Sequence, residues 1–172
     1  MEHLVITVIA ADQAGLVERI ARCISEHQGN WLESRMSRMA GQFAGIVSVA
    51  VPSAEQGRLL TSLQALSSQG IRVQIAESGG EPSAVRQAVT MELVGNDRPG
   101  IVRDISRVLA QLAVNVERLS TQVQPAPMSN EPLFRAEAVL ALPAELSLER
   151  LQQRLEGLAD ELMVELTVRA EA

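Results

Sequence analysis

The chain has 172 residues and a formal charge of −6, and 47% of its residues are apolar but only 2% are aromatic. This length allows one ordinary domain or two small ones, and the apolar fraction can fill a core in either case. All 15 basic residues are arginines spread along an acidic chain without tyrosine, which argues against direct binding to nucleic acid.

Cys23 is the only cysteine, so the chain cannot form an intramolecular disulfide or a cysteine-based metal cluster. We expect it to be a buried, unreactive filler on an apolar helix face. Residues 4–11 are apolar, but the run is short and lacks a basic lead-in, so it predicts neither a signal peptide nor a membrane span. These features predict a cytoplasmic protein that does not bind a membrane.

The first half of the chain alternates between strand and helix periodicity. In chain order it predicts a strand over 3–11, a helix that starts at Leu16 and is stopped by Gly29, a hairpin of strands over 30–39 and 43–51 around Gly41, a helix carrying Leu59 to Leu66, and a strand over 71–75. The glycines, prolines and serines that follow predict a linker over 79–87 between a first domain at 1–78 and a second at 88–172.

The second half repeats this order. It predicts a strand over 88–95, a helix over 99–113, a hairpin of strands over 115–123 and 133–142, a helix carrying Leu148 to Leu158, and a strand over 162–168. The aspartates (97 − 12), glycines (100 − 15) and asparagines (115 − 30) of the two halves all differ by 85 positions. Six extra residues in the second half fall at a hairpin tip between Gln124 and Pro132. The repeat predicts an α+β fold of two ferredoxin-like βαββαβ domains, antiparallel sheets with helices on one face.

The turn from Asn96 to Val102 is the best candidate for a functional site, because strand periodicity changes there to helix periodicity. We expect Asp97 to cap the new helix and Pro99 to lie in its first turn, whereas Gly100 would let another group approach the backbone. The start of a helix exposes unpaired N–H groups and the positive end of its dipole, so such a turn suits a carboxylate. His3 and His27 are isolated and no serine lies in a nucleophile motif, so we expect no metal, no cofactor and no catalytic residue.

A strand leading into Asp-x-Pro-Gly-Ile-Val, a helix, and asparagine at the start of the next strand resemble the ACT domain, a small regulatory module of amino-acid metabolism. The matching residues are Asp97, Pro99, Gly100, Ile101 and Asn115, with Asp12, Gly15, Leu16 and Asn30 in the first copy. Arg98 lies within the second turn, and the first copy departs from the pattern at Gln13 and Ala14. With two such units and no catalytic domain, the chain looks most like the glycine cleavage system transcriptional repressor family.

The resemblance implies a small amino-acid ligand, glycine or similar. The backbone at Gly15 and Gly100 would receive its carboxylate, Asn30 and Asn115 would accept from its ammonium group, and Asp12 or Asp97 would add charge. A ligand between two domains would then bias their arrangement. The same residues also fit a purely structural role in capping and turn formation.

For function, the resemblance implies a non-catalytic homodimer that contacts a transcriptional activator protein and so controls genes of amino-acid metabolism. One alternative is a regulatory subunit of a metabolic enzyme. A second is a small acylphosphatase-like hydrolase, which shares the topology and would use Arg98 and Asn115 around a phosphate.

Overall fold

The computed structural model describes residues 1–79 and 86–171. It divides into two compact units, Met1–Glu81 and Pro82–Ala172. Most of the linker predicted at 79–87 lies outside the described residues, and Gln87 already belongs to a strand. Within the described ranges, no helix combines the length and the apolar character that crossing a membrane would require.

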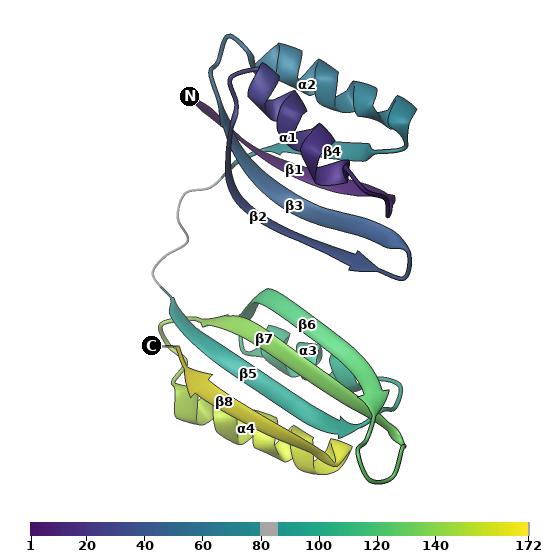
Figure 1. Ribbon diagram of the computed structural model, residues 1–172. Helices are drawn as coiled ribbons and strands as arrows, with labels where there is room; N and C mark the ends of the chain where they lie inside the picture. The colour runs from purple at the N-terminus through teal and green to yellow at the C-terminus, as the bar shows by residue number, and fades with distance from the viewer. Residues whose placement is uncertain (80–85, 172) are drawn as a thin grey trace. The chain divides into compact units, whose positions relative to one another are not determined.

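The first unit is a four-stranded antiparallel sheet with two helices on one face (Figure 1). Its elements are β1 (Glu2–Ala11), α1 (Leu16–Glu26), β2 (Asn30–Met39), β3 (Gln42–Val51), α2 (Gln56–Ala65), the 3-10 turn η1 (Leu66–Gln69) and β4 (Arg72–Glu77). The strand order is β2-β3-β1-β4. β2 is therefore an edge strand, and β1 occupies the centre beside β3 and β4.

The core of the first unit lies between the sheet and the two helices. Strand periodicity of two places alternate β1 residues on the helix-covered face, and helical spacing turns one stripe of α1 toward them. The buried residues of these two elements are Leu4, Ile6, Val8, Ala10, Leu16, Ile20, Cys23 and Ile24. The β2–β3 hairpin turns at Ala40 and Gly41, which both have positive φ as a tight two-residue connection requires.

The second unit repeats the first. Its elements are β5 (Gln87–Asn96), α3 (Ile101–Gln111), β6 (Asn115–Pro125), β7 (Pro132–Leu142), α4 (Leu148–Leu162) and β8 (Val164–Ala170). The strand order is β6-β7-β5-β8, so β6 is the edge strand that corresponds to β2. The predicted fold class, two βαββαβ units with antiparallel sheets, is confirmed.

Some predicted boundaries were wrong. Leu162 is the last residue of α4 and not the start of a strand, because Met163 takes up a left-handed conformation that ends the helix, and β8 begins only at Val164. The helix predicted over 99–113 is shorter at both ends and spans Ile101–Gln111. Both edge strands contain an irregularity in register, after Trp31 in β2 and after Val116 in β6, so the duplication extends to this detail.

A polar cluster joins the two helices of the first unit. His27, at the end of α1, lies 2.8 Å from Ser62 Oγ through Nε2 and 3.4 Å from Glu55 Oε2 through Nδ1. All three side chains are partly buried. The corresponding position at the end of α3 is Leu112, which packs against the second core. The first unit therefore uses hydrogen bonds where the second uses apolar contact.

Replacing His27 with alanine is expected to lower the free energy of unfolding of the first unit by about 1–2 kcal/mol, because two hydrogen bonds are lost and their partners stay partly buried. Urea denaturation measures this change. His3→Ala is the matched control, since His3 is exposed near the start of β1. Equal stability of the two variants would show that the cluster contributes nothing.

Candidate functional site

The turn between the first strand and first helix of each unit is the predicted site. Its last residue is a glycine with a left-handed backbone, Gly15 at φ +89° and Gly100 at φ +94°. α1 begins at Leu16 and α3 at Ile101, and neither has a side-chain cap. The expectation that Asp97 caps α3 was therefore wrong, as was the placing of Pro99 inside the helix. A left-handed glycine completes the turn, so the capping position is taken by a residue without a side chain.

Both helix starts consequently leave their first N–H groups without a side-chain acceptor. The first intrahelical bonds run from Arg19 N to Gly15 O at 3.1 Å and from Asp104 N to Gly100 O at 3.0 Å. The three N–H groups before each of these donors have no intrahelical acceptor. Together with the helix dipole, they form a corner suited to a carboxylate.

In the first unit, a shallow hollow covers this corner. Its lining consists of Asp12, Gln13, Gly15, Leu16, Val17, Glu18 and Phe43. The first four of these are among the six site residues predicted for this copy. Ala14 lies exposed in the turn itself. Asp12 pairs with Arg38 at 2.7 Å, and Glu18 already places a carboxylate on the first turn of α1. Glu18 would repel a second carboxylate there.

In the second unit, the charges of the first helical turn are exchanged, because Arg103 and Asp104 stand where the first unit has Glu18 and Arg19. Arg103 stands where Glu18 stands in the first unit, and its guanidinium folds back over Gly100, so that a Cβ on Gly100 would lie 2.8 Å from Nη2. Its Nε also donates to Asp104 at 3.1 Å. Arg98 is exposed in the turn that precedes α3, and the guanidinium that lies beside Gly100 is that of Arg103.

Arg103 was missed by the sequence reasoning, which considered only the turn and the asparagines. The available signal was the comparison of aligned positions, because Arg103 and Glu18 are 85 positions apart and opposite in charge. The guanidinium lies near Gly100 because of the conformation of the Arg103 side chain. This conformation cannot be predicted from the spacing of residues in the sequence.

The two asparagines lie far from the turn of their own unit, so the expectation that they enter the strand beside it was wrong. Asn30 lies level with Ala50 and His3, whereas the turn follows Ala11 at the opposite end of β1. The eight residue steps from His3 to Ala11 span about 27 Å along the strand. The physical reason is that α1 carries the chain back along the sheet, so that β2 starts beside the beginning of β1.

The second unit has the same arrangement. Asn115 lies level with Ala141 and Ala88, again about 27 Å along the strand from the end of β5. Arg98 and Asn115 therefore do not converge on one phosphate within the unit, and the acylphosphatase-like alternative lacks its geometry. The turn lies instead beside the hairpin end, where Asp97 N donates to Pro132 O at 3.0 Å.

Cys23 lies buried on the inner face of α1, as predicted. Burial, assisted by the nearby carboxylate of Glu26, raises the pKa of its thiol. A raised pKa lowers the thiolate fraction at neutral pH, and thiolate is the reactive form. Cys23 is therefore a packing residue.

Comparison with known proteins finds a family match within the first unit. Residues 2–76 match the sequence model of the ACT domain family. No curated protein matches the chain by sequence.

Solved structures with the same fold cover both units. An unknown protein from Galdieria sulphuraria has a TM-score of 0.88 at 24% identity, over 99% of each chain. A protein named "putative glycine cleavage system transcriptional repressor" has a TM-score of 0.70 at 19% identity, over 99% of this chain and 97% of its own. At these identities the likeness concerns the fold alone.

Proposed function

We propose that the chain is a non-catalytic regulatory protein that senses a small amino acid, on the basis that residues 2–76 match the sequence model of the ACT domain family. It would control transcription of amino-acid metabolism genes through contact with another protein. The match of residues 2–76 to the ACT domain model and the similarity in fold to the protein named "putative glycine cleavage system transcriptional repressor" support a regulatory role. The observation that carries the sensing function is the open helix start beside Arg103 in the second unit.

The chemistry of this corner suits the carboxylate of an amino acid. Backbone N–H groups of α3 supply directed donors, and the guanidinium of Arg103 supplies charge from the side of Gly100. Asp97 is exposed in the same turn and would accept from the ammonium group. Asn115 lies at the other end of the unit from this turn. A single ligand would therefore contact both an asparagine and a turn of this kind only if the two came from different ACT units.

The contact with a partner protein is supported by the face of the first unit's sheet that lies opposite its own helices. Ile9 and Ile46 lie on this face as diagonal neighbours of β1 and β3, and they are 43% and 48% exposed. In the second unit, the positions that correspond to them carry Val94 and Glu137. Contiguous exposed apolar side chains are typical of protein contact surfaces.

Reversing the charge of Arg103 tests the sensing function. We expect Arg103→Glu to weaken amino-acid binding by roughly tenfold to a hundredfold, because a charge-assisted hydrogen bond is replaced by repulsion. Isothermal titration calorimetry of the full chain with glycine, serine, alanine, valine and leucine measures this effect.

The matched control is Arg107→Glu, which makes the same charge change one turn further along α3. We expect it to bind as the natural chain does. Absence of heat and of any thermal shift with all five amino acids at millimolar concentration would refute the sensing function.

A further inference from the structure

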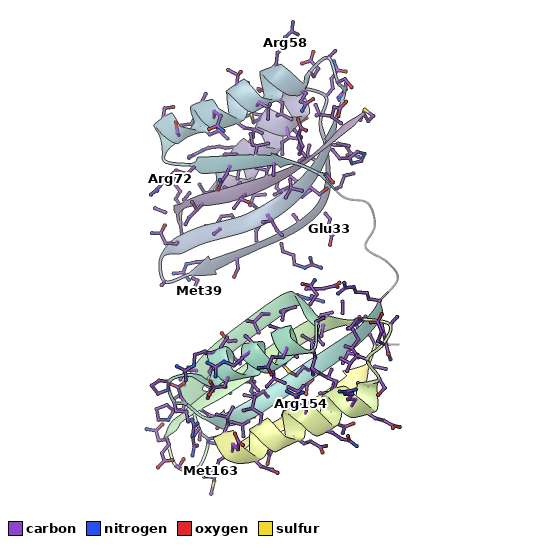
Figure 2. The ribbon with its side chains drawn as sticks, turned by 180° about the vertical axis from the view of Figure 1, so that it is seen from behind. Glu33, Met39, Arg58, Arg72, Arg154 and Met163 are labelled. Atoms are coloured by element: carbon purple, nitrogen blue, oxygen red, sulfur yellow. The ribbon has the colours of Figure 1, made fainter. Side chains whose placement is uncertain are left out.

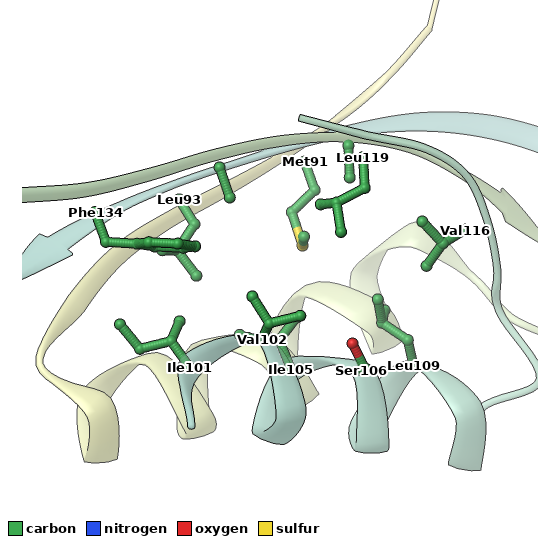
Figure 3. Close-up of a pocket in the computed structure, with 12 residues that line it drawn as sticks. Met91, Leu93, Ile101, Val102, Ile105, Ser106, Leu109, Val116, Leu119 and Phe134 are labelled. Atoms are coloured by element: carbon green, nitrogen blue, oxygen red, sulfur yellow. The ribbon is translucent and has the colours of Figure 1, made fainter. Parts of the chain in front are cut away.

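Each sheet has an inner face, which the two helices of its unit cover, and an outer face on the opposite side. Figure 3 shows the inner face of the second unit, where α3 lies over Met91, Leu93 and Phe134 and a cavity of about 30 Å³ remains in the apolar layer. Among the described residues, neither outer face is covered by a helix of its own unit (Figure 1). Side chains on an outer face must therefore suit water or be covered by another molecule.

The outer face of the second unit suits water. Strand pairing places charged side chains of both signs on it: Glu92, Arg118, Arg135, Glu137, Glu165 and Arg169. Glu92 and Arg169 form an ion pair at 3.0 Å. Polar residues that alternate with buried apolar residues are typical of an antiparallel sheet with one face in solvent.

The outer face of the first unit is different at the same positions. Strand pairing forms it from Val5, Thr7, Ile9, Arg35, Ser37, Ala44, Ile46, Ser48, Arg72, Gln74 and Ala76. Ile46 stands where the second unit has Glu137, and Thr7 stands where it has Glu92. Ile9 and Ile46 are nearly half exposed. The first unit thus leaves an apolar centre in water at positions where its duplicate carries charge.

The size of this face is sufficient for a weak contact between two copies of the chain. β1, β2 and β3 have ten residues each, and β4 has six. At about 3.3 Å per residue and about 4.8 Å between strands, the face measures roughly 600 Å². Two such faces would remove roughly 1,200 Å² from water, which is near the lower limit for a specific interface. An interface of this size is expected to form reversibly.

The charges of this face favour a second copy as the molecule that covers it. The chain has a net charge of −6, so two copies repel each other through most of their surfaces. On the outer face of the first unit, the charged residues within the described strands lie toward the edges: Arg35 with its ion-pair partner Glu33 in β2, and Arg72 in β4. If β2 of one copy lies over β4 of the other, Glu33 and Arg72 come to the same edge of the interface with opposite charges. A two-fold axis forms this contact twice.

We propose that two copies of the chain associate by stacking the outer faces of their first units, with Ile9 and Ile46 at the centre of the interface. The inference rests on the proposed function, in which the same face contacts a regulatory partner. Self-association and partner binding would then compete for one surface. The fraction of chains open to the partner would fall as the concentration of the chain rises.

Sedimentation of the full chain tests the proposal. Between roughly 1 and 200 μM the average mass is expected to rise from 18.6 kDa toward twice this value, because an interface of this size gives micromolar affinity. Ile46→Glu introduces the residue that the second unit carries at this position. It should weaken association by roughly a hundredfold or more, since a two-fold interface would bury the new charge twice.

Thr7→Glu, which copies Glu92 of the second unit, is a second variant in case Ile46→Glu disturbs folding. It should also prevent association. Val94→Glu is the matched control, because it places the same charge on the outer face of the second unit, at the position that corresponds to Ile9. It should associate as the natural chain does.

Methyl spectra of isoleucine-labelled protein locate the interface. The signals of Ile9 and Ile46 should shift as the concentration rises, whereas those of the buried Ile20 and Ile105 should stay constant. Association that leaves Ile9 and Ile46 unchanged would place the contact on another surface and overturn the proposal.

The outcomes separate this inference from the proposed function. A chain that stays monomeric over the whole range, or a dimer that persists in both Ile46→Glu and Thr7→Glu, would overturn the stacked interface and leave amino-acid sensing intact. A dimer that is lost in these variants, formed by a chain that binds no amino acid, would support the interface and refute the sensing function.

Discussion

Replacing Gly45 with alanine is expected to destabilise the first unit by about 3 kcal/mol, at the upper end of the usual cost of overpacking. Gly45 lies in β3 opposite Met36 of β2. A Cβ there would overlap the carbonyl oxygen of Arg35 and lie 2.7 Å from the Cα of Met36. Both obstacles are backbone atoms, so the strand itself would have to shift. A loss of this size is a large part of the stability of a small domain.

Two measurements check this result. The urea midpoint should fall by about 1 M or more, and hydrogen exchange should accelerate in β1, β2 and β3. Gly157→Ala in α4 is the matched control, because nothing lies within 4 Å of its added Cβ and the residue is helical. It should stabilise the protein by about 1 kcal/mol. An unchanged midpoint for Gly45→Ala would show that the strands can separate at little cost.

Replacing Leu155 with alanine is expected to cost about 3–4 kcal/mol through the loss of buried methyl groups and the cavity that remains. Leu155 is fully buried on the face of α4 that packs against the second core. In Figure 2 this helix is the lower element that carries the label Arg154, the exposed neighbour of Leu155. The polar outer stripe and the buried inner stripe follow from helical spacing.

Chemical denaturation of the full chain, followed by hydrogen exchange in β5, β7 and β8, measures this effect. Met128→Ala is the control, since Met128 is 98% exposed in the hairpin tip and should change stability by less than about 0.5 kcal/mol. A Leu155→Ala protein as stable as the control would mean that α4 does not hold the sheet together.

Much of the fold was predictable because its signals are local. The alternation of apolar and polar residues in β1 and β5, and the helical spacing of apolar residues in α1 and α3, can be recognised from residues that are close in sequence. The shared offset of 85 positions then transferred each assignment to the other half. Prediction failed at the ends of elements, as at Leu162. Leucine fits both a helix pattern and a strand pattern, and the left-handed backbone of the next residue, Met163, is what ends the helix at Leu162.

The candidate site was predictable only in part. The position of each turn was correct, but the role of Asp97 as a cap was not, because a left-handed Gly100 takes the capping position. Arg103 was overlooked, and its closeness to Gly100 follows from how one side chain folds back. Asn30 and Asn115 were placed beside the turn, although strand direction puts them at the other end of each sheet.

The sequence by itself determined the order of the elements, the duplication and the composition of both cores, because periodicity depends on residues that are near each other in the chain. Only the tertiary structure decided which distant residues meet. The pairing of strands separates Asn115 from the turn, and residues of α3, β5, β6 and β7 line one cavity only because these elements pack together. These facts depend on register and on volumes summed over several segments, which no single stretch of sequence contains.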